Sequence, residues 1–436
     1  MAYEITDRDI FLSKTKEKNL KIFWGGFILY QLSFSLTTTL IYFNIVQLQL
    51  LQFSGIAVMV YGSLNIIKFK IKNGYLNFIY IIYLLWMLSI IARGFKYDLF
   101  SIKETLVDPG FGILIYFVPL FLLFPANFTF YRQLFWVINL FAIFYFIYSL
   151  SFVKHLIDPD RESNLSKSIV ENFSTLSFCS AFTLMTYIYH PKMRKLLAFG
   201  AVFATLLFAV YRARRGLILM TVVNLMSILV VYLIVTKRTI MVLYVVILAA
   251  LIGYFYYSSL YNQKNFGIFN FLVERGNEDT RTGVEDAMKD DMSSTDWIWG
   301  KGFDGEYYCP NIDDLDTRGY RAFVETGFLQ IMLKGGIGSL ALLLLILIPA
   351  MWQGITKGKN IFSKACGIWI LLAVLYMYPT VGNSFMLSYI TVWICVGVCF
   401  NPAILRMTDA EVADALNPAP KSSTRKRTRA VMPGHT

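Results

Sequence analysis

The side chains that most often hold metals or form disulfides are scarce in this chain. Its 436 residues include only 3 His and 5 Cys. Cys179, Cys366, Cys395 and Cys399 lie in apolar runs, where cysteine behaves as a small hydrophobic residue. Cys309 stands alone in a polar segment, which excludes a disulfide framework there. The histidines are scattered, and no His or Cys spacing typical of a metal site is present.

One cluster of oxygen-bearing side chains looks like a calcium loop but lacks its turn. It consists of Asn311, Asp313, Asp314 and Asp316. An EF-hand loop needs glycine at its sixth position for a sharp bend, and Asp316 stands there instead. We therefore expect no metal and no other cofactor.

Charged residues are also scarce, at 16% of the chain, where about 25% is typical of a soluble domain. Hydrophobic residues make up 56%, and apolar runs recur at the length of roughly 20 residues that a bilayer core requires. This composition excludes an ordinary soluble domain and predicts an all-α polytopic membrane protein. We expect about 12 transmembrane helices, near residues 22–39, 46–66, 75–92, 111–125, 133–152, 172–189, 196–211, 217–235, 239–257, 330–350, 364–378 and 384–400.

Lysine and arginine recur in alternate loops between these spans, which predicts the orientation of the chain. By the positive-inside rule those loops and both termini are cytoplasmic. The net charge of +12 then follows from topology and from attraction to anionic lipids, so we expect no nucleic-acid partner. The basic groups are Lys14, Lys16, Lys18 and Lys21; Lys68, Lys70 and Lys72; Lys192, Arg194 and Lys195; Lys237 and Arg238; Lys357, Lys359 and Lys364; and residues 421–429.

The expected organisation has five parts. The region before Ile22 is charged and precedes a full span without a small-residue cleavage site, so we expect no cleavable signal peptide. The last part is basic and poor in apolar residues, which predicts disorder. The parts are a cytoplasmic leader (1–21), spans one to nine (22–257), a large outer loop (258–325), spans ten to twelve (326–402) and a cytoplasmic tail (403–436).

The outer loop is the one long polar stretch of the chain. Ser258–Ala322 contains 13 Asp and Glu residues, and loops of this length are usually functional or disordered. Within it, Gly283–Met292 predicts a short amphipathic helix with Val284, Ala287, Met288 and Met292 on one face. The following stretch, 297–303, is rich in aromatic residues, which fit either the membrane interface or stacking on sugar rings. Its Gly300 and Gly302 allow a tight turn, a weak signal for phosphate binding.

Three arginines, Arg212, Arg214 and Arg215, lie between the seventh and eighth spans, on the outer side of the membrane in the predicted topology. The positive-inside rule disfavours this position. One interpretation is that the long side chains reach from the bilayer to the interface. The other is anion binding, because guanidinium groups bind phosphate oxygens in pairs, and Gly216 would let a ligand approach closely.

Further charged candidates lie in and after the outer loop. Arg281 lies among acids, while Arg318 and Arg321 precede the tenth span, so each fits an ion pair as well as a binding role. Glu325 stands where the polar loop meets an apolar helix. A carboxylate there suits a general base, or simply an acid that interacts with the positive end of the helix dipole. The following Gly335-Gly336-Ile337-Gly338 predicts close packing of that helix.

The order of these features resembles the superfamily of O-antigen polymerases and O-antigen ligases, over about Ala204–Leu345. Arg215-Gly216 falls where the family has an arginine at the membrane edge, and Arg281 falls on its loop arginine. Residues 299–302 fall on its Gly-x-Gly stretch. Glu325 stands where ligases typically show the histidine of a His-Asn pair, and this departure favours a polymerase.

The resemblance implies a metal-independent glycosyltransferase of the bacterial inner membrane, with the large loop in the periplasm. It would transfer a glycan from an undecaprenyl-diphosphate-linked donor to another lipid-linked repeat unit. Expected partners are the lipid-linked oligosaccharide, anionic lipids, a chain-length regulator and a flippase. The expected catalytic residues are Glu325, Arg215 and Arg281, and the expected substrate-binding residues are Arg212, Arg214, Gly300, Gly302 and Arg321.

Two alternatives remain open at the level of sequence. An O-antigen ligase would pass the finished glycan to the lipid A-core. A flippase or other polysaccharide transporter belongs to a different class, and it would show polar groups at mid-membrane and broken helices. The near absence of charge within the apolar spans favours chemistry at the membrane surface.

The predicted topology can be tested with reporter fusions. A reporter fused at Asn277 should lie outside the cytoplasm and one fused at Lys421 inside it, because an odd number of predicted spans separates them. Alkaline phosphatase and fluorescent-protein activity would measure this. The same compartment for both fusions would contradict the predicted number of spans between them.

Overall fold

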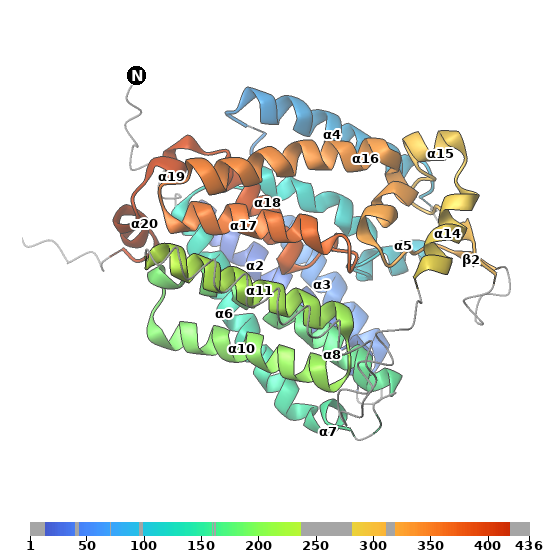
Figure 1. Cartoon of the computed structure of the whole chain (residues 1–436), viewed down its shortest axis with the longest axis horizontal. Helices are drawn as coiled ribbons and strands as arrows, with labels where there is room; N and C mark the ends of the chain where they lie inside the picture. Colours follow the sequence, from blue (N-terminus) through green and yellow to red (C-terminus); the bar gives the residue numbers. More distant parts are fainter. Residues whose placement is uncertain are drawn as a thin grey trace, which may run out of the picture.

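The computed structural model describes residues 14–39, 43–69, 71–95, 99–158, 160, 163–236, 281–310 and 319–418. Over these ranges the chain forms a bundle of apolar helices with a small polar subdomain at one end (Figure 1). The first half of the bundle consists of α2 (Lys14–Ser35), η1 (Thr37–Thr39), α3 (Ile45–Ser63), α4 (Gly74–Ala92), α5 (Leu99–Val107), η2 (Ile113–Leu123), α6 (Phe128–Ser151), α7 (Val153–Leu156), α8 (Asn164–Ser177), α9 (Ser180–Met185), η3 (Tyr187–Tyr189), α10 (Lys192–Tyr211) and α11 (Arg215–Val235).

The second half begins with the polar subdomain, which we define as residues 281–310 and 319–326. The helices of the bundle then resume and end at the opposite side of the molecule in α19 and α20 (Figure 1). The elements are α14 (Thr282–Asp291), α15 (Ser294–Trp299), β1 (Tyr307–Tyr308), β2 (Tyr320–Arg321), α16 (Gly327–Trp352), the π-helical turn η4 (Gln353–Lys357), α17 (Ile361–Tyr376), α18 (Leu387–Cys399), α19 (Pro402–Arg406) and α20 (Asp409–Leu416).

The predicted class of a helical, multi-pass membrane protein is confirmed. Among the described residues, six helices are long and apolar enough to cross a bilayer: α3, α4, α6, α10, α11 and α16 with η4. Three shorter apolar helices, η2, α17 and α18, pack with them. The total of twelve spans stays a prediction, and the expected span at 239–257 lies outside the described residues.

The first and fourth predicted spans take a different form from a simple membrane helix. Helix α2 already begins at Lys14, within the predicted leader, and its Phe27 and Tyr30 are fully buried in the bundle core. Gly26 and Gly55 allow α2 and α3 to approach so closely that a methyl group at Gly26 would lie 2.6 Å from the Gly55 carbonyl oxygen. The fourth span is the 11-residue 3₁₀ helix η2, which contains Pro119.

The sixth predicted span is interrupted. Its residues form α8, α9 and η3 in succession, with turns between them. Buried hydroxyl groups in this stretch bond to nearby main-chain carbonyls, as Ser177 does to Ser174 (3.0 Å) and Thr186 to Phe182 (2.9 Å). Side-chain bonding of this kind competes with the helix ladder and bends helices, which accounts for breaks that an apolar run does not reveal.

The prediction of a disordered tail from residue 403 is wrong for its first part. Helices α19 and α20 occupy 402–416 because their ends are well capped. Asn401 caps α19, and Thr408 forms a capping box with Glu411 in α20. Hydrogen bonds from Thr408 to the Glu411 carboxylate lower the pKa of that group. Asn360 then fastens the segment to the bundle by donating to the carbonyl of Ile404 (2.8 Å).

The polar subdomain has its own small hydrophobic core. The predicted amphipathic helix at 283–292 is confirmed as α14, whose Val284 and Met288 are buried, together with Met292 directly after it. These side chains pack on Tyr307 of the short antiparallel hairpin β1–β2 and on the first turns of α16. The core therefore joins the polar subdomain to the helix that follows Glu325.

Candidate functional site

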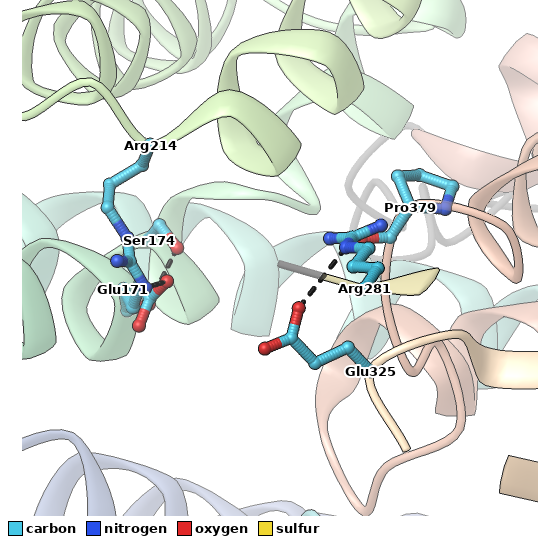
Figure 2. A network of polar contacts seen from close by, with 6 residues as sticks. All are labelled: Glu171, Ser174, Arg214, Arg281, Glu325 and Pro379. Atoms are coloured by element: carbon cyan, nitrogen blue, oxygen red, sulfur yellow. Dashed lines mark hydrogen bonds and ion pairs between the residues drawn. The ribbon is translucent and has the colours of Figure 1, made fainter. Parts of the chain in front are cut away.

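The predicted residues Arg281 and Glu325 form an ion pair. Arg281 directly precedes α14, and its Nε donates to Oε2 of Glu325 at 3.2 Å. Its Nη2 donates to the main-chain carbonyl of Pro379, in the loop between α17 and α18, at 2.9 Å. Figure 2 shows the guanidinium between these two acceptors. The structure thus joins three segments that lie far apart in the sequence.

The main chain around Glu325 is held firmly while its carboxylate stays accessible. Val324 is fully buried, and its N–H donates to Oε1 of Gln330 at 2.9 Å. Thr326 is also buried, and its hydroxyl donates to the carboxylate of Glu285. The Glu325 side chain is 47% exposed between these two anchored neighbours. This arrangement presents a carboxylate to a ligand at a fixed place.

The ion pair between Arg281 and Glu325 is weak because both side chains are exposed to solvent. Side-chain exposures of 38% and 47% place it in solvent, where such a pair contributes about 0–1 kcal/mol to stability. A phosphate group that offers two oxygens to the guanidinium forms a stronger, charge-assisted interaction. The pair can therefore open for an anionic ligand at little cost to the fold.

The carbonyl of Pro379 is also held in place by the packing around its loop. The N–H of Phe328, in the first turn of α16, donates to the carbonyl of Met377 at 3.2 Å. A methyl group at Gly327 would lie 2.6 Å from the carbonyl oxygen of Thr380, so the helix start touches this loop directly. On the other side, the N–H of Phe385 donates to Pro109 at 2.7 Å.

The structure gives Arg212 a structural role in place of the expected substrate contact. Its side chain is only 1% exposed. Its guanidinium donates to the carbonyls of His155 (2.7 Å), Leu156 (3.3 Å) and Asp160 (2.6 Å). Hydrogen bonds from a charged group contribute about 1.5–3 kcal/mol each. Arg212 thus holds the end of α7 and the segment after it against the turn between α10 and α11.

Arg214 and Arg215 stand at the beginning of α11, directly after Ala213. Ala213 adopts φ +50°, a left-handed conformation that is uncommon for alanine and marks a tight, determined turn. Arg214 donates to the carboxylate of Glu171 in α8, and the two side chains are 31% and 47% exposed (Figure 2). Arg215 is exposed in the first turn of the helix. Sequence reasoning missed Glu171, which carried no signal beyond being a lone acid.

The beginning of α11 adjoins the Arg281–Glu325 pair. A methyl group at Gly216 would lie 3.5 Å from the carbonyl oxygen of Pro379, the same oxygen that accepts from Arg281. The N-terminal end of this 21-residue helix carries partial positive charge, which adds to that of the arginines. The main chain of Arg215-Gly216, Arg281 and Glu325 therefore meet around one carbonyl group.

Gly300 and Gly302, expected to bind substrate, join the polar subdomain to the bundle instead. The N–H groups of Lys301, Gly302 and Phe303 donate to the carbonyls of Leu333 (2.8 Å), Lys334 (3.0 Å) and Ile90 (3.0 Å), while that of Gly300 donates to Asp296 (2.7 Å). The main-chain donors that a phosphate would need are thus already occupied. Both glycines have positive φ, +72° and +85°, which favours glycine.

Two side chains of the α4 region complete this junction, and sequence reasoning missed both. Arg93 donates to the carbonyls of Trp299 (2.7 Å) and Gly300 (2.8 Å). Trp86 donates to the carbonyl of Gly335 (2.8 Å), and its ring stacks on Trp299 with centroids 4.8 Å apart. The break in α16, at Gly336, lies against the main chain just before this turn. Trp299 therefore packs on an α4 side chain, which neither interpretation of the aromatic stretch anticipated.

Arg321 lies on β2, paired with Tyr307 of the hairpin. A small surface depression at the ion pair is lined by Arg281, Val284, Glu285, Val324, Glu325 and Thr326. Within the described ranges, no group of three His, Cys, Asp or Glu side chains could hold a metal ion. The cluster at 311–316 lies outside those ranges.

Comparison with known proteins adds no relative. No protein-family model, no curated protein and no solved structure matches this chain.

The junction at Gly302 yields a stability prediction. A methyl group at Gly302 would lie 1.8 Å from the carbonyl oxygen of Arg93, so Gly302→Ala must displace the subdomain. We expect a loss of at least about 1–3 kcal/mol, as for overpacked sites. Limited proteolysis of the detergent-solubilised protein should cleave the variant faster between residues 281 and 326.

Gly25→Ala is the matched control, because nothing lies within 4 Å of the added methyl group. Gly25 is helical in α2, so alanine there should leave stability equal or slightly higher. Equal protease resistance and equal melting temperatures for Gly302→Ala and the wild type would contradict the assigned junction.

Proposed function

We propose that the chain transfers a glycan from an undecaprenyl-diphosphate-linked donor to a lipid-linked repeat unit, at the outer face of the bacterial inner membrane. The observation that carries this proposal is the meeting of Arg281, Glu325 and the Arg215-Gly216 turn at one end of an apolar bundle. A lipid-linked diphosphate has its charge at the membrane surface and its tail in the bilayer. Cations at the end of apolar helices match that shape.

The arginines would bind the donor. Arg281 exchanges its exposed carboxylate partner for phosphate oxygens, and Arg215 approaches from the positive end of α11. When the acceptor hydroxyl attacks the anomeric carbon, the bond to the diphosphate oxygen breaks and the diphosphate leaves with the electron pair. Guanidinium groups placed there stabilise the charge that develops on the leaving group.

Glu325 would act as the general base. Once Arg281 turns to the diphosphate, the carboxylate is free to accept the proton of the attacking hydroxyl. Its anchored main chain keeps it beside the arginine, so base and leaving-group site stay adjacent. Glu325 would thus have two successive partners, the Arg281 guanidinium before the donor binds and the acceptor hydroxyl after it binds.

The same cations would serve an O-antigen ligase, which differs in its acceptor. A deletion strain separates the two by gel analysis of lipopolysaccharide. A single attached repeat unit indicates a polymerase. Loss of all attached glycan, with lipid-linked polymer retained, indicates a ligase.

One observation favours the transporter alternative. The interrupted stretch α8–α9–η3 and its buried hydroxyls, among them Ser180 and Thr183, are features of helices that line a transport path. The ion pairs of the site argue against a transporter. They lie at the end of the bundle, where an enzyme that acts at the membrane surface would have its charged groups. A transporter would leave repeat units on the cytoplasmic leaflet in the deletion strain.

The substitution Glu325→Gln tests the base. It preserves size and a hydrogen-bond acceptor for Arg281 but cannot accept a proton. We expect turnover to fall about 10²–10⁴-fold with protein level unchanged. Polymer formation in membranes, normalised to extracted protein, is the measurement.

Asp286→Asn controls for loss of a negative charge in the same subdomain. The Asp286 side chain is 57% exposed and pairs with Lys289, so its loss should leave turnover near the wild-type value. If Glu325→Gln makes glycan of normal length at a normal rate, Glu325 is not the base, and its role is limited to the pair with Arg281 and the dipole of α16.

A further inference from the structure

The hairpin β1–β2 presents two tyrosines to solvent. Tyr307 points inward, is fully buried, and donates to the carbonyl of Phe323 at 2.9 Å. Neighbouring side chains of a strand point to opposite faces, so Tyr308 points outward, opposite Tyr320. Their rings lie 5.4 Å apart at an angle of 62°. The outer face of the hairpin is therefore a pair of aromatic rings.

Both rings are accessible to solvent. Tyr308 is 50% exposed and Tyr320 is 43% exposed. The buried Tyr307 belongs to the subdomain core, whereas Tyr308 and Tyr320 lie outside that core. Side by side on the outer face of the hairpin, the two rings form an aromatic surface that a ligand can reach.

The tyrosine pair lies close to the candidate base. Tyr320 and Glu325 are five positions apart in the sequence, a stretch that spans at most about 18 Å. Between them, Phe323 meets the half-exposed Phe111 edge to face, with centroids 4.6 Å apart. Phe323 and Phe111 thus form a second aromatic pair, beside the stretch of chain that leads from Tyr320 to Glu325.

Exposed tyrosines can contact either a bilayer surface or a sugar. The charge of the subdomain distinguishes between these two. Its described residues include eight Asp and Glu but four Lys and Arg. Even Lys289 is surrounded by acids, and its hydrogen bond to Asp286 raises its pKa. An anionic bilayer surface repels such a subdomain. An uncharged sugar does not, and its C–H face packs on aromatic rings while its hydroxyls remain in water.

We propose that Tyr308 and Tyr320 form a stacking platform for pyranose rings of the glycan chain. The platform holds a sugar away from the reacting bond, so it keeps a growing chain attached between transfers. This inference rests on the proposed function, because it assigns the glycan of that reaction to the hairpin. It acts on binding and chain length and leaves the chemical step unchanged.

Binding of the polysaccharide tests the platform. The probe is the soluble polysaccharide that mild acid releases from the strain that encodes the chain. It is titrated onto the full-length protein in nanodiscs of neutral lipid, with binding followed by saturation-transfer NMR. We expect Tyr308→Ala/Tyr320→Ala to raise Kd about tenfold, the effect of losing aromatic contacts of roughly 1.4 kcal/mol. Polymer made in membranes should be shorter, with the first transfer at the normal rate.

Two variants control the experiment. Tyr308→Phe/Tyr320→Phe keeps both rings and should bind nearly as the wild type does. Tyr61→Ala removes a tyrosine that is 64% exposed on α3, and it should change neither binding nor length. Gel filtration in detergent confirms that each variant is folded.

The outcomes separate the platform from the proposed function. Wild-type binding and polymer length in the double alanine variant would overturn the platform and leave glycan transfer intact. Weaker association with anionic vesicles, with polysaccharide binding unchanged, would identify a membrane anchor and also overturn it. A wild-type chain that binds the polysaccharide but forms no polymer would overturn the transfer proposal alone.

Discussion

Four main-chain hydrogen bonds hold the polar subdomain in its shape and against the apolar bundle. The N–H groups of residues 301–303 donate to carbonyls of α4 and α16, and that of Gly300 closes the turn before them. A buried main-chain group without a partner costs about 1–3 kcal/mol, so a polar segment on apolar helices must pair these groups completely. Arg93 and Trp86 add bonds to the same turn. The subdomain core then places Arg281 and Glu325 beside the beginning of α11.

Features governed by local spacing were predictable from the sequence. The apolar periodicity predicted α14 and its buried face, and hydropathy predicted the spans now seen as α3, α4, α6, α10, α11 and α16. Hydropathy did not predict the break in the sixth span, because Ser177 and Thr186 act through hydroxyl bonds to their own helix. Likewise, the tail helices α19 and α20 depend on caps and on distant partners such as Asn360.

The site was predictable in outline only. Sequence order identified Arg215, Arg281 and Glu325, and the structure brings their segments together around the carbonyl of Pro379. It could not separate Arg212, which donates to main-chain carbonyls in and after α7, from its neighbours in the same basic cluster. The packing role of Gly300 and Gly302 was not predictable for a related reason. A glycine required by close main-chain packing leaves the same pattern in the sequence as one required by a phosphate.

In the proposed reaction, Arg281 leaves Glu325 to bind a lipid-linked diphosphate. Titration of undecaprenyl diphosphate onto the protein in nanodiscs measures this directly, with Arg281→Ala compared against Lys289→Ala, another exposed cation of the same subdomain. Loss of charge-assisted bonds worth roughly 1.5–3 kcal/mol should raise Kd about 10–100-fold for Arg281→Ala. Lys289→Ala should bind as the wild type does. Equal affinity of the two variants for the diphosphate would contradict the account.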